Sequence, residues 1–307
     1  MTRTSDPPSV DEPGATPTRP RPAASVEAYV ADVVAACAEP AGALVSLVLF
    51  GSAATGGFAA SISDVDLLAI LRDNTDAVER RRVRDTIATL EARHGLAKPP
   101  WRGPPLARAL AAFADRVNAN VRAFFVCTRA DLLSGDPARI LGIPRAQAAF
   151  VDRVAVPSIV ASGVTVWGED LLAAVPLPPI RRLDVAKAFF GLFNQALFTA
   201  VWYPLLPGAT KNAMDTLKRS VHSCYFCHHG RPAPLAVEVA YFEARYGPIP
   251  ALARLLMLRH AYRPSFRYVV GCLPALARLH WRTARDVRFP RPPLSLGVSR
   301  VEVLLDT

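Results

Sequence analysis

The stretch Leu49–Leu71, LFGSAATGGFAASISDVDLLAIL, decides the fold. The apolar run Leu44–Phe50 leads into Gly51-Ser52, eleven residues follow, and Asp64-Val65-Asp66 then opens a second apolar run. Alternate side chains of a strand point to the same face, so the two aspartates lie on one side of the chain. The stretch therefore predicts two strands, with a glycine turn after the first and a carboxylate pair at the start of the second.

The residue types in this stretch favour one kind of chemistry. A Gly-Ser turn lets the backbone approach a ligand closely, since glycine has no Cβ. Carboxylate oxygens are the ligands that Mg²⁺ uses in sites that handle phosphates. A turn that can hold phosphates beside carboxylates that can hold Mg²⁺ is the minimum equipment for nucleotidyl transfer.

Hydrophobic patterning along the rest of the chain separates a mixed first half from a helical second half. In the first half the patterns predict helices over 25–38, 76–94, 106–117 and 148–161, and strands over 44–50, 65–71, 121–127 and 164–167. In the second half they predict helices over 185–203, 213–227, 235–245, 249–262 and 268–282. The second helix of the first half has apolar residues at Val83, Ile87 and Leu90. We therefore expect an α/β catalytic unit joined to an all-helical unit.

Composition shifts suggest the boundaries of these units. Residues 1–24 are rich in proline and lack an apolar core, which predicts a disordered tail. A proline-rich segment at 175–179 divides a catalytic domain over 25–174 from a helical domain over 175–288. Residues 289–307 form a C-terminal tail, in which 301–305 is a candidate strand.

Charge and cysteine content bear on partners and compartment. The 307 residues carry a net charge of +10, which favours anionic partners or reflects an arginine-rich codon bias. The five scattered cysteines and the absence of a signal-peptide pattern predict a cytoplasmic protein with free thiols. The longest apolar stretch, 188–206, contains Asn194, Gln195 and Pro204, which indicates a buried helix and no membrane partner.

The two motifs Phe50-Gly51-Ser52 and Asp64-Val65-Asp66-Leu67 together resemble the DNA-polymerase-β-like nucleotidyltransferase superfamily. Within it, the chain looks most like aminoglycoside-type and minimal nucleotidyltransferases with a C-terminal helical domain. The resemblance implies an α+β fold, with a small mixed sheet backed by helices. It also implies a reaction in which two Mg²⁺ ions align a nucleoside triphosphate.

The resemblance assigns roles to four residues. Gly51 and Ser52 would hold the triphosphate, and Asp64 and Asp66 would be catalytic and bind the metal ions. A hydroxyl of the acceptor would attack the α-phosphorus, taking an NMP, most simply AMP, and releasing pyrophosphate. The acceptor can be a small molecule, a protein or an RNA, and the oligomeric state is left open.

Two lysines of the helical half are a further candidate contact. Lys211 and Lys218 are seven positions apart, which places them on one face of a helix. Lys218 is our candidate for a nucleotide-binding residue contributed by the helical half. The alternative is a solvated helix face.

The motif departs from the family pattern at one position. Active members usually carry a third carboxylate on a later strand, and the predicted strand 121–127 has Arg122 where an acid is expected. The nearest acids are Asp115 and Asp131, both outside that strand. A catalytically degenerate nucleotide-binding or regulatory module is therefore an alternative function. A weaker alternative, an RNA-acting toxin-like protein, rests on the net charge.

Overall fold

We describe the 307-residue chain from a computed structural model. The structure describes residues 24–38, 42–55, 64–97, 104–117, 123–148, 154–206 and 208–291. The predicted tail, apart from Ala24, and the predicted strand 301–305 lie outside the described residues.

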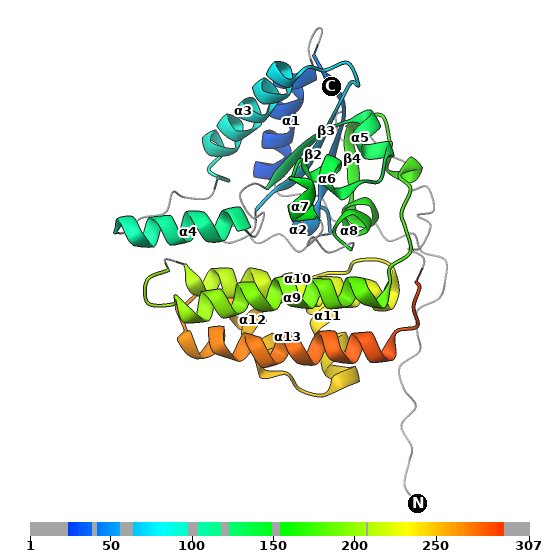
Figure 1. Ribbon diagram of the computed structural model, residues 1–307. Coiled ribbons are helices and arrows are strands. Elements are labelled where there is room, and N and C mark those ends of the chain that lie inside the picture. Colours follow the sequence, from blue (N-terminus) through cyan, green and yellow to red (C-terminus); the bar gives the residue numbers. More distant parts are fainter. Residues whose placement is uncertain are drawn as a thin grey trace, which may run out of the picture.

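A four-stranded mixed sheet forms the centre of the first half (Figure 1). Its strands are β1 (Leu44–Phe50), β2 (Asp66–Leu71), β3 (Phe124–Thr128) and β4 (Val164–Gly168), in the order β3-β2-β1-β4. β1 pairs antiparallel with β2 and with β4, whereas β3 pairs parallel with β2. The two strands of the decisive stretch are thus central, which explains why both are apolar along their length.

Helices cover both faces of this sheet. On one face, α1 (Ala24–Ala38) and α3 (Ala77–Arg93) pack against inward-facing side chains such as Leu47 and Leu67. On the other face, neighbours such as Val48 and Leu68 pack against shorter helices. The remaining helices of this half are α2 (Gly51–Ala54), α4 (Pro105–Val117), α5 (Arg129–Leu133), α6 (Pro137–Leu141), α7 (Arg145–Ala148), α8 (Ala155–Ser162) and the 3₁₀ turn η1 (Leu172–Ala174).

The second half consists of helices packed side by side (Figure 1). They are α9 (Arg182–Val201), α10 (Ala209–His229), α11 (Leu235–Tyr246), α12 (Pro250–His260) and α13 (Phe266–Asp286). α9, α10 and α13 pack on one another, and α11 and α12 complete the apolar core. The predicted α+β fold, a mixed sheet with flanking helices followed by a helical region, is therefore confirmed.

Element ends differ from the predictions where local chemistry sets them. α10 starts four residues earlier than the predicted 213–227, after Gly208, and ends before Gly230, both of which adopt positive φ. β3 extends to Thr128, whose hydroxyl then caps α5. Within the predicted helix 148–161, Ala148 is the last residue of α7 and the residues from Ala155 onward form α8, whereas 149–153 lie outside the described residues.

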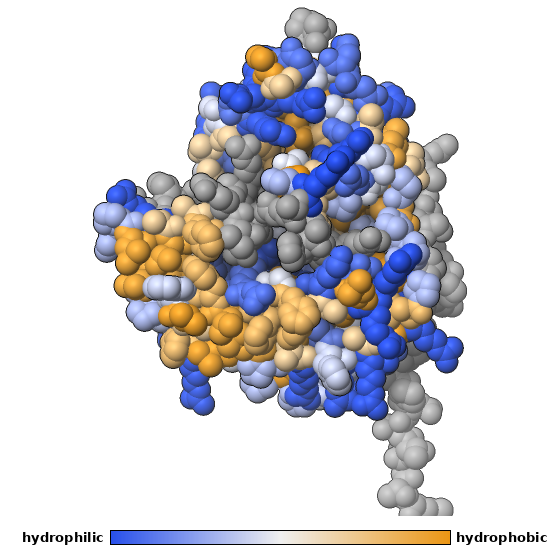
Figure 2. Space-filling view, in the orientation of Figure 1, coloured by the Kyte–Doolittle hydropathy of each residue, from blue (hydrophilic) through white to orange (hydrophobic). Residues whose placement is uncertain are grey.

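The apolar character of the helices, the exposed apolar side chains and the state of the cysteines complete the description of the fold. Within the described ranges, none of the helices has both the length and the apolar character needed to cross a membrane. Figure 2 shows apolar side chains gathered over α4 and the adjoining end of α9, and the exposed ones include Leu106, Phe113 and Val201. All five cysteines are free and buried, as the sequence predicts.

Candidate nucleotide site at the end of β1

The turn after β1 has a backbone that favours glycine. Gly51 follows Phe50 and has a φ of +67°, in the left-handed region. Gly51 is also the first residue of the single turn α2, and the hydroxyl of Thr55, directly after α2, donates a hydrogen bond of 3.0 Å to the carbonyl of Gly51. The sharp change of direction leaves Gly51 and Ser52 partly exposed at the end of a buried strand.

β-sheet register brings Asp66 to this turn. Asp66 pairs directly with Phe50, the last residue of β1. A Cβ built on Gly51 would overlap the carboxylate oxygen Oδ2 of Asp66. The Asp66 carboxylate therefore lies directly against the glycine backbone, and a side chain at position 51 would displace it.

The two aspartates have the same degree of exposure. Asp64 and Asp66 are both partly exposed, whereas Val65 between them is buried. The structure thus brings Gly51 and Asp66 together, with Ser52 next to Gly51 in the turn, whereas Asp64 lies two residues before Asp66, outside β2. The arrangement offers carboxylate oxygens and a close backbone approach at one end of the sheet.

These residues fit a divalent hard cation. Across the described ranges, no three or more His, Cys, Asp or Glu side chains are grouped so that they could hold a metal ion by themselves. Mg²⁺ usually takes one or two protein carboxylates, with substrate phosphates and water completing its octahedron. The pair Asp64 and Asp66 meets that requirement, and any Mg²⁺ here would depend on the phosphates of a ligand.

The neighbouring strand does not supply a third carboxylate in the part that is described. Leu67 of β2 lies beside Phe124 of β3, and its amide donates to the carbonyl of Ala123. None of the residues Phe124–Thr128 is acidic. Arg122, where the sequence suggested that an acid was missing, and the side chain of Asp115 lie outside the description.

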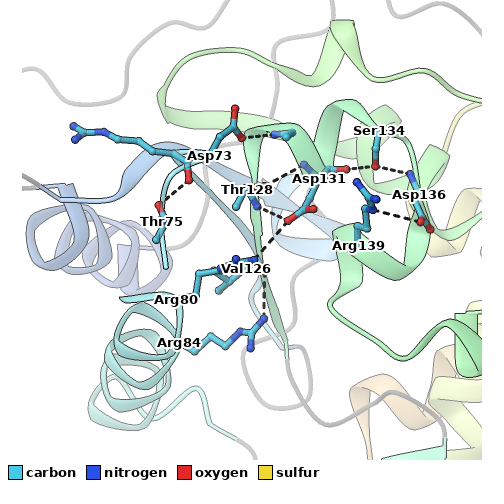
Figure 3. Close-up of polar contacts among 12 residues, drawn as sticks. Asp73, Thr75, Arg80, Arg84, Val126, Thr128, Asp131, Ser134, Asp136 and Arg139 are labelled. Atoms are coloured by element: carbon cyan, nitrogen blue, oxygen red, sulfur yellow. Dashed lines mark hydrogen bonds and ion pairs between the residues drawn. The ribbon is translucent and has the colours of Figure 1, made fainter. Parts of the chain in front are cut away.

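Asp131 lies at the other end of the sheet, because β3 runs parallel to β2 and Asp131 follows its last residue (Figure 3). Its carboxylate accepts a hydrogen bond from the Thr128 amide at 3.1 Å, and its own amide donates to the Thr128 hydroxyl. Arg80 lies 3.9 Å from the same carboxylate. Asp131 therefore caps α5 and is not part of the Gly51–Asp66 site.

Comparison with known proteins agrees with this geometry. Residues 32–97, which include β1, α2 and β2, match the family described as a nucleotidyltransferase domain. The predicted resemblance to the polymerase-β-like nucleotidyltransferase superfamily is confirmed. The matched range contains both sequence motifs, Phe50-Gly51-Ser52 and Asp64-Val65-Asp66-Leu67.

A solved structure supports the nucleotidyltransferase fold beyond the matched range. The chain is similar to spectinomycin adenyltransferase AAD(9) from Enterococcus faecialis, solved with ATP and spectinomycin, with a TM-score of 0.50 and 10% sequence identity. The similarity covers 83% of this chain and 98% of that one. At this identity the likeness concerns the fold. No curated protein matches the sequence.

The remaining predicted site residue, Lys218, belongs to the helical half of the chain. It lies on α10 and lines a hollow together with Lys211, which confirms that the two lysines share a helix face. Arg259 and Tyr262 line the same hollow from α12 and the residues that follow it.

The sequence analysis did not single out two arginines of the helical half, Arg219 and Arg259, that lie close to Lys218. Arg219 on α10 donates a hydrogen bond to the amide oxygen of Gln195 on α9. Burial lowers the pKa of Arg219, and it does the same to the pKa of Arg259. Nothing in the spacing distinguishes these arginines from the many others in the chain, because their burial depends on helix packing.

Proposed function

We propose that the protein is a Mg²⁺-dependent nucleotidyltransferase that moves an NMP, specifically AMP, from an NTP to a hydroxyl of an acceptor. The coarser part of this proposal, nucleotidyl transfer in general, is supported by the family match over residues 32–97. The observation that carries the site assignment is the contact between the Asp66 carboxylate and the Gly51 backbone.

Each residue of the site would have a distinct role. The exposed backbone of Gly51 and the hydroxyl of Ser52 would hold the terminal phosphates, and Lys218 would add a positive charge from the helical half. The carboxylates of Asp64 and Asp66 would position Mg²⁺, which when bound supplies charge neutralisation for the attacking and leaving oxygens. The acceptor hydroxyl would form a bond to the α-phosphorus while the bond to pyrophosphate breaks. Catalysis would therefore depend mainly on how the protein positions the acceptor and the triphosphate.

A second candidate function is a nucleotide-binding module without turnover. It is favoured by one observation: the described part of β3 carries no carboxylate beside β2, and Asp131 is used to cap α5 at the other end of the sheet. A general base for the acceptor hydroxyl is thus absent from the described residues of that strand.

The experiment that tests the proposal is a thermal-shift series with ATP, GTP, CTP and UTP, each with and without Mg²⁺. We expect ATP with Mg²⁺ to raise the melting temperature by several degrees, since a ligand at about 100 times its Kd stabilises the fold by about 2.7 kcal/mol. Asp64→Asn and Asp66→Asn should each abolish this shift, because each removes a negative charge that holds the metal. Asp85→Asn, on the exposed face of α3, is the matched control and should keep it.

Pyrophosphate release then separates the two candidate functions. Release that depends on Mg²⁺ and on both aspartates supports transfer, whereas saturable binding without release supports the module. If neither aspartate affects a nucleotide-induced shift, the site assignment is wrong.

A further inference from the structure

The C-terminal helices carry almost the whole net charge of the chain. Residues 244–291 contain ten arginines and one acid, Asp286, which gives +9 of the total of +10. Between Glu243 and Asp286 the sequence has no acidic residue. A codon bias toward arginine would add cations throughout the chain, but it would not remove the acids from one stretch. The positive charge is therefore a local property of α12, α13 and the residues beside them.

On α13 these arginines form a stripe along the exposed side of the helix. Arg267, Arg278 and Arg285 are all exposed, and their spacings of 11 and 7 residues are close to whole numbers of helical turns. Trp281 and Arg282 lie between them, and Trp281 is 74% exposed. Figure 2 shows hydrophilic side chains projecting along the lower edge of the helical layer, where Figure 1 draws α13.

Carboxylates do little to neutralise this stripe. Asp286, at the end of α13, pairs with Arg245 of α11 at 3.3 Å. Arg278 donates hydrogen bonds to backbone carbonyls, which carry no net charge. Arg267 and Arg285 form no ion pair with any residue that the structure describes. The stripe therefore presents its positive charge to solvent.

The length of the stripe favours a polyanion over a small anion. Arg267 and Arg285 are 18 residues apart, which corresponds to about 27 Å along the helix. At physiological ionic strength, exposed charges are screened beyond about 8 Å. A single phosphate would interact with one part of the stripe, whereas a chain of phosphates could contact all of it. Guanidinium groups suit such a chain, because each can bind two phosphate oxygens at once.

Trp281 distinguishes between the possible polyanions. An exposed indole among guanidinium groups is suited to stacking on a nucleobase, and the bases of a single strand are free to stack. An anionic membrane is a weaker fit, because a helix enters a bilayer through its apolar side. That side of α13 is buried in the helical core, with Val269, Leu276 and Leu279 among its members.

We propose that this stripe, formed by Arg267, Arg278, Trp281, Arg282 and Arg285, binds single-stranded nucleic acid. The guanidinium groups contact successive phosphates, and Trp281 stacks on a base. α13 packs on α9 and α10, and in Figure 1 it lies on the side of the helical layer away from the sheet. The surface is thus separate from the Gly51–Asp66 site, and the inference goes beyond the proposed function without depending on it.

The test measures fluorescence anisotropy of a labelled single-stranded RNA of about 20 nucleotides, longer than the sites of single-strand-binding folds. The full chain is titrated in EDTA without nucleoside triphosphate, and a DNA of the same sequence is the second probe. We expect saturable binding that weakens about fiftyfold between 50 and 200 mM salt, as four phosphate contacts to a single strand predict. Tighter binding of one probe identifies RNA or DNA as the ligand.

Two variants separate stacking from charge. Trp281→Ala should weaken binding about tenfold and leave its salt dependence unchanged, because it removes a stacking partner but no cation. Arg267→Gln/Arg285→Gln should weaken binding at 50 mM salt about tenfold or more and lower the salt slope by about 1.4, because two phosphate contacts are lost. All three positions are exposed, so the variants are expected to fold.

Matched controls make the same changes at exposed positions elsewhere. Phe190→Ala on α9 and Arg81→Gln/Arg108→Gln on α3 and α4 should leave the Kd unchanged. An equal loss in the control pair would mean that binding follows net charge alone and would overturn the proposal. Absence of binding at 50 mM salt, or a Kd indifferent to Arg267→Gln/Arg285→Gln, would also overturn it.

Two further probes test the choice of ligand. A duplex of the same sequence that binds more tightly than either single strand would contradict the role of Trp281. Vesicles containing phosphatidylserine that compete more effectively than unlabelled single strand would show that the stripe is a membrane surface. Weaker binding of both probes supports the proposal.

The nucleic-acid surface and the proposed transfer activity can fail separately. Asp64→Asn should leave oligonucleotide binding in EDTA intact, because that measurement needs neither metal nor nucleotide. Loss of the nucleotide-induced thermal shift with retained oligonucleotide binding is a failure of the Gly51–Asp66 site alone. The reverse outcome rejects only the nucleic-acid surface.

Discussion

Gly51 is subject to two constraints at once. Its φ of +67° is unfavourable for any residue with a Cβ, and the Asp66 carboxylate occupies the space that a Cβ would need. Gly95, at the end of α3, has almost the same φ of +68° but no atom within 4 Å of the Cβ position. The two glycines separate the backbone cost of a substitution from its effect on the site.

We predict that Gly51→Ala lowers the free energy of unfolding by more than Gly95→Ala, which should cost about 1–2 kcal/mol for the left-handed conformation alone. Gly51→Ala should also abolish the Mg²⁺-dependent thermal shift, because the Asp66 carboxylate must move. Chemical denaturation and the nucleotide thermal-shift assay measure the two effects. Equal destabilisation by both substitutions, with nucleotide binding intact, would mean that Asp66 does not depend on Gly51.

At the scale of helices, α10 and α13 are joined by a buried polar contact. Ser220 and the Nε2 atom of His280 lie 2.9 Å apart, and His280 is only 3% exposed. Burial lowers the pKa of His280 to about 4. The neutral imidazole is therefore the form that the packed helices accommodate, since a charged ring here would lose its hydration.

This burial predicts a pH dependence of stability. The folded pKa lies below the unfolded value of about 6.5, so the unfolded chain binds an extra proton between pH 6.5 and 4. His280 therefore contributes stability that is complete above about pH 6.5 and is lost as the pH falls toward 4, at roughly 1.4 kcal/mol per pH unit. Urea unfolding at pH 7.5, 6 and 5 should give a flatter dependence for His280→Gln than for the wild type. His260→Gln, at an exposed position of α12, is the control, and an unchanged slope in His280→Gln would contradict the prediction.

At the scale of the whole molecule, α4 of the first half contacts the helical half. Ala111 is fully buried in a cluster with Leu206 and Ala209, and Phe113 lies 5.9 Å from Phe198 between ring centroids. The following residue, Ala112, is exposed. A change at this contact therefore tests how far the arrangement of the halves depends on a small apolar cluster.

We predict that Ala111→Asp lowers the free energy of unfolding by about 3 kcal/mol or more, because it buries an unpaired charge between the halves. Ala112→Asp introduces the same charge one position along, in solvent, and should stay within about 0.5 kcal/mol of the wild type. Calorimetry compares the two variants, and an equal effect of both would show that α4 does not pack against the helical half in solution.

Much of the fold could be predicted because it depends on short-range patterns. Val83, Ile87 and Leu90 recur at helical spacing and are all buried against the sheet. Leu44–Phe50 is apolar because β1 is a central strand covered on both faces. Some helix ends were predicted at the wrong residue, such as the start of α10 after Gly208. These ends depend on the backbone conformation of single residues, which the spacing of apolar residues does not indicate.

The sequence by itself determined which residues could form a nucleotide site, since Gly51-Ser52 and the Asp64–Asp66 pair are recognisable from spacing along one strand and one turn. Only the tertiary structure decided that Asp66 lies against Gly51, that Asp131 lies at the opposite end of the sheet, and that the half-buried Arg219 bonds to a neutral partner. The physical reason is that side-chain direction within an element follows from its period, whereas strand register and helix packing depend on contacts between residues far apart in the chain.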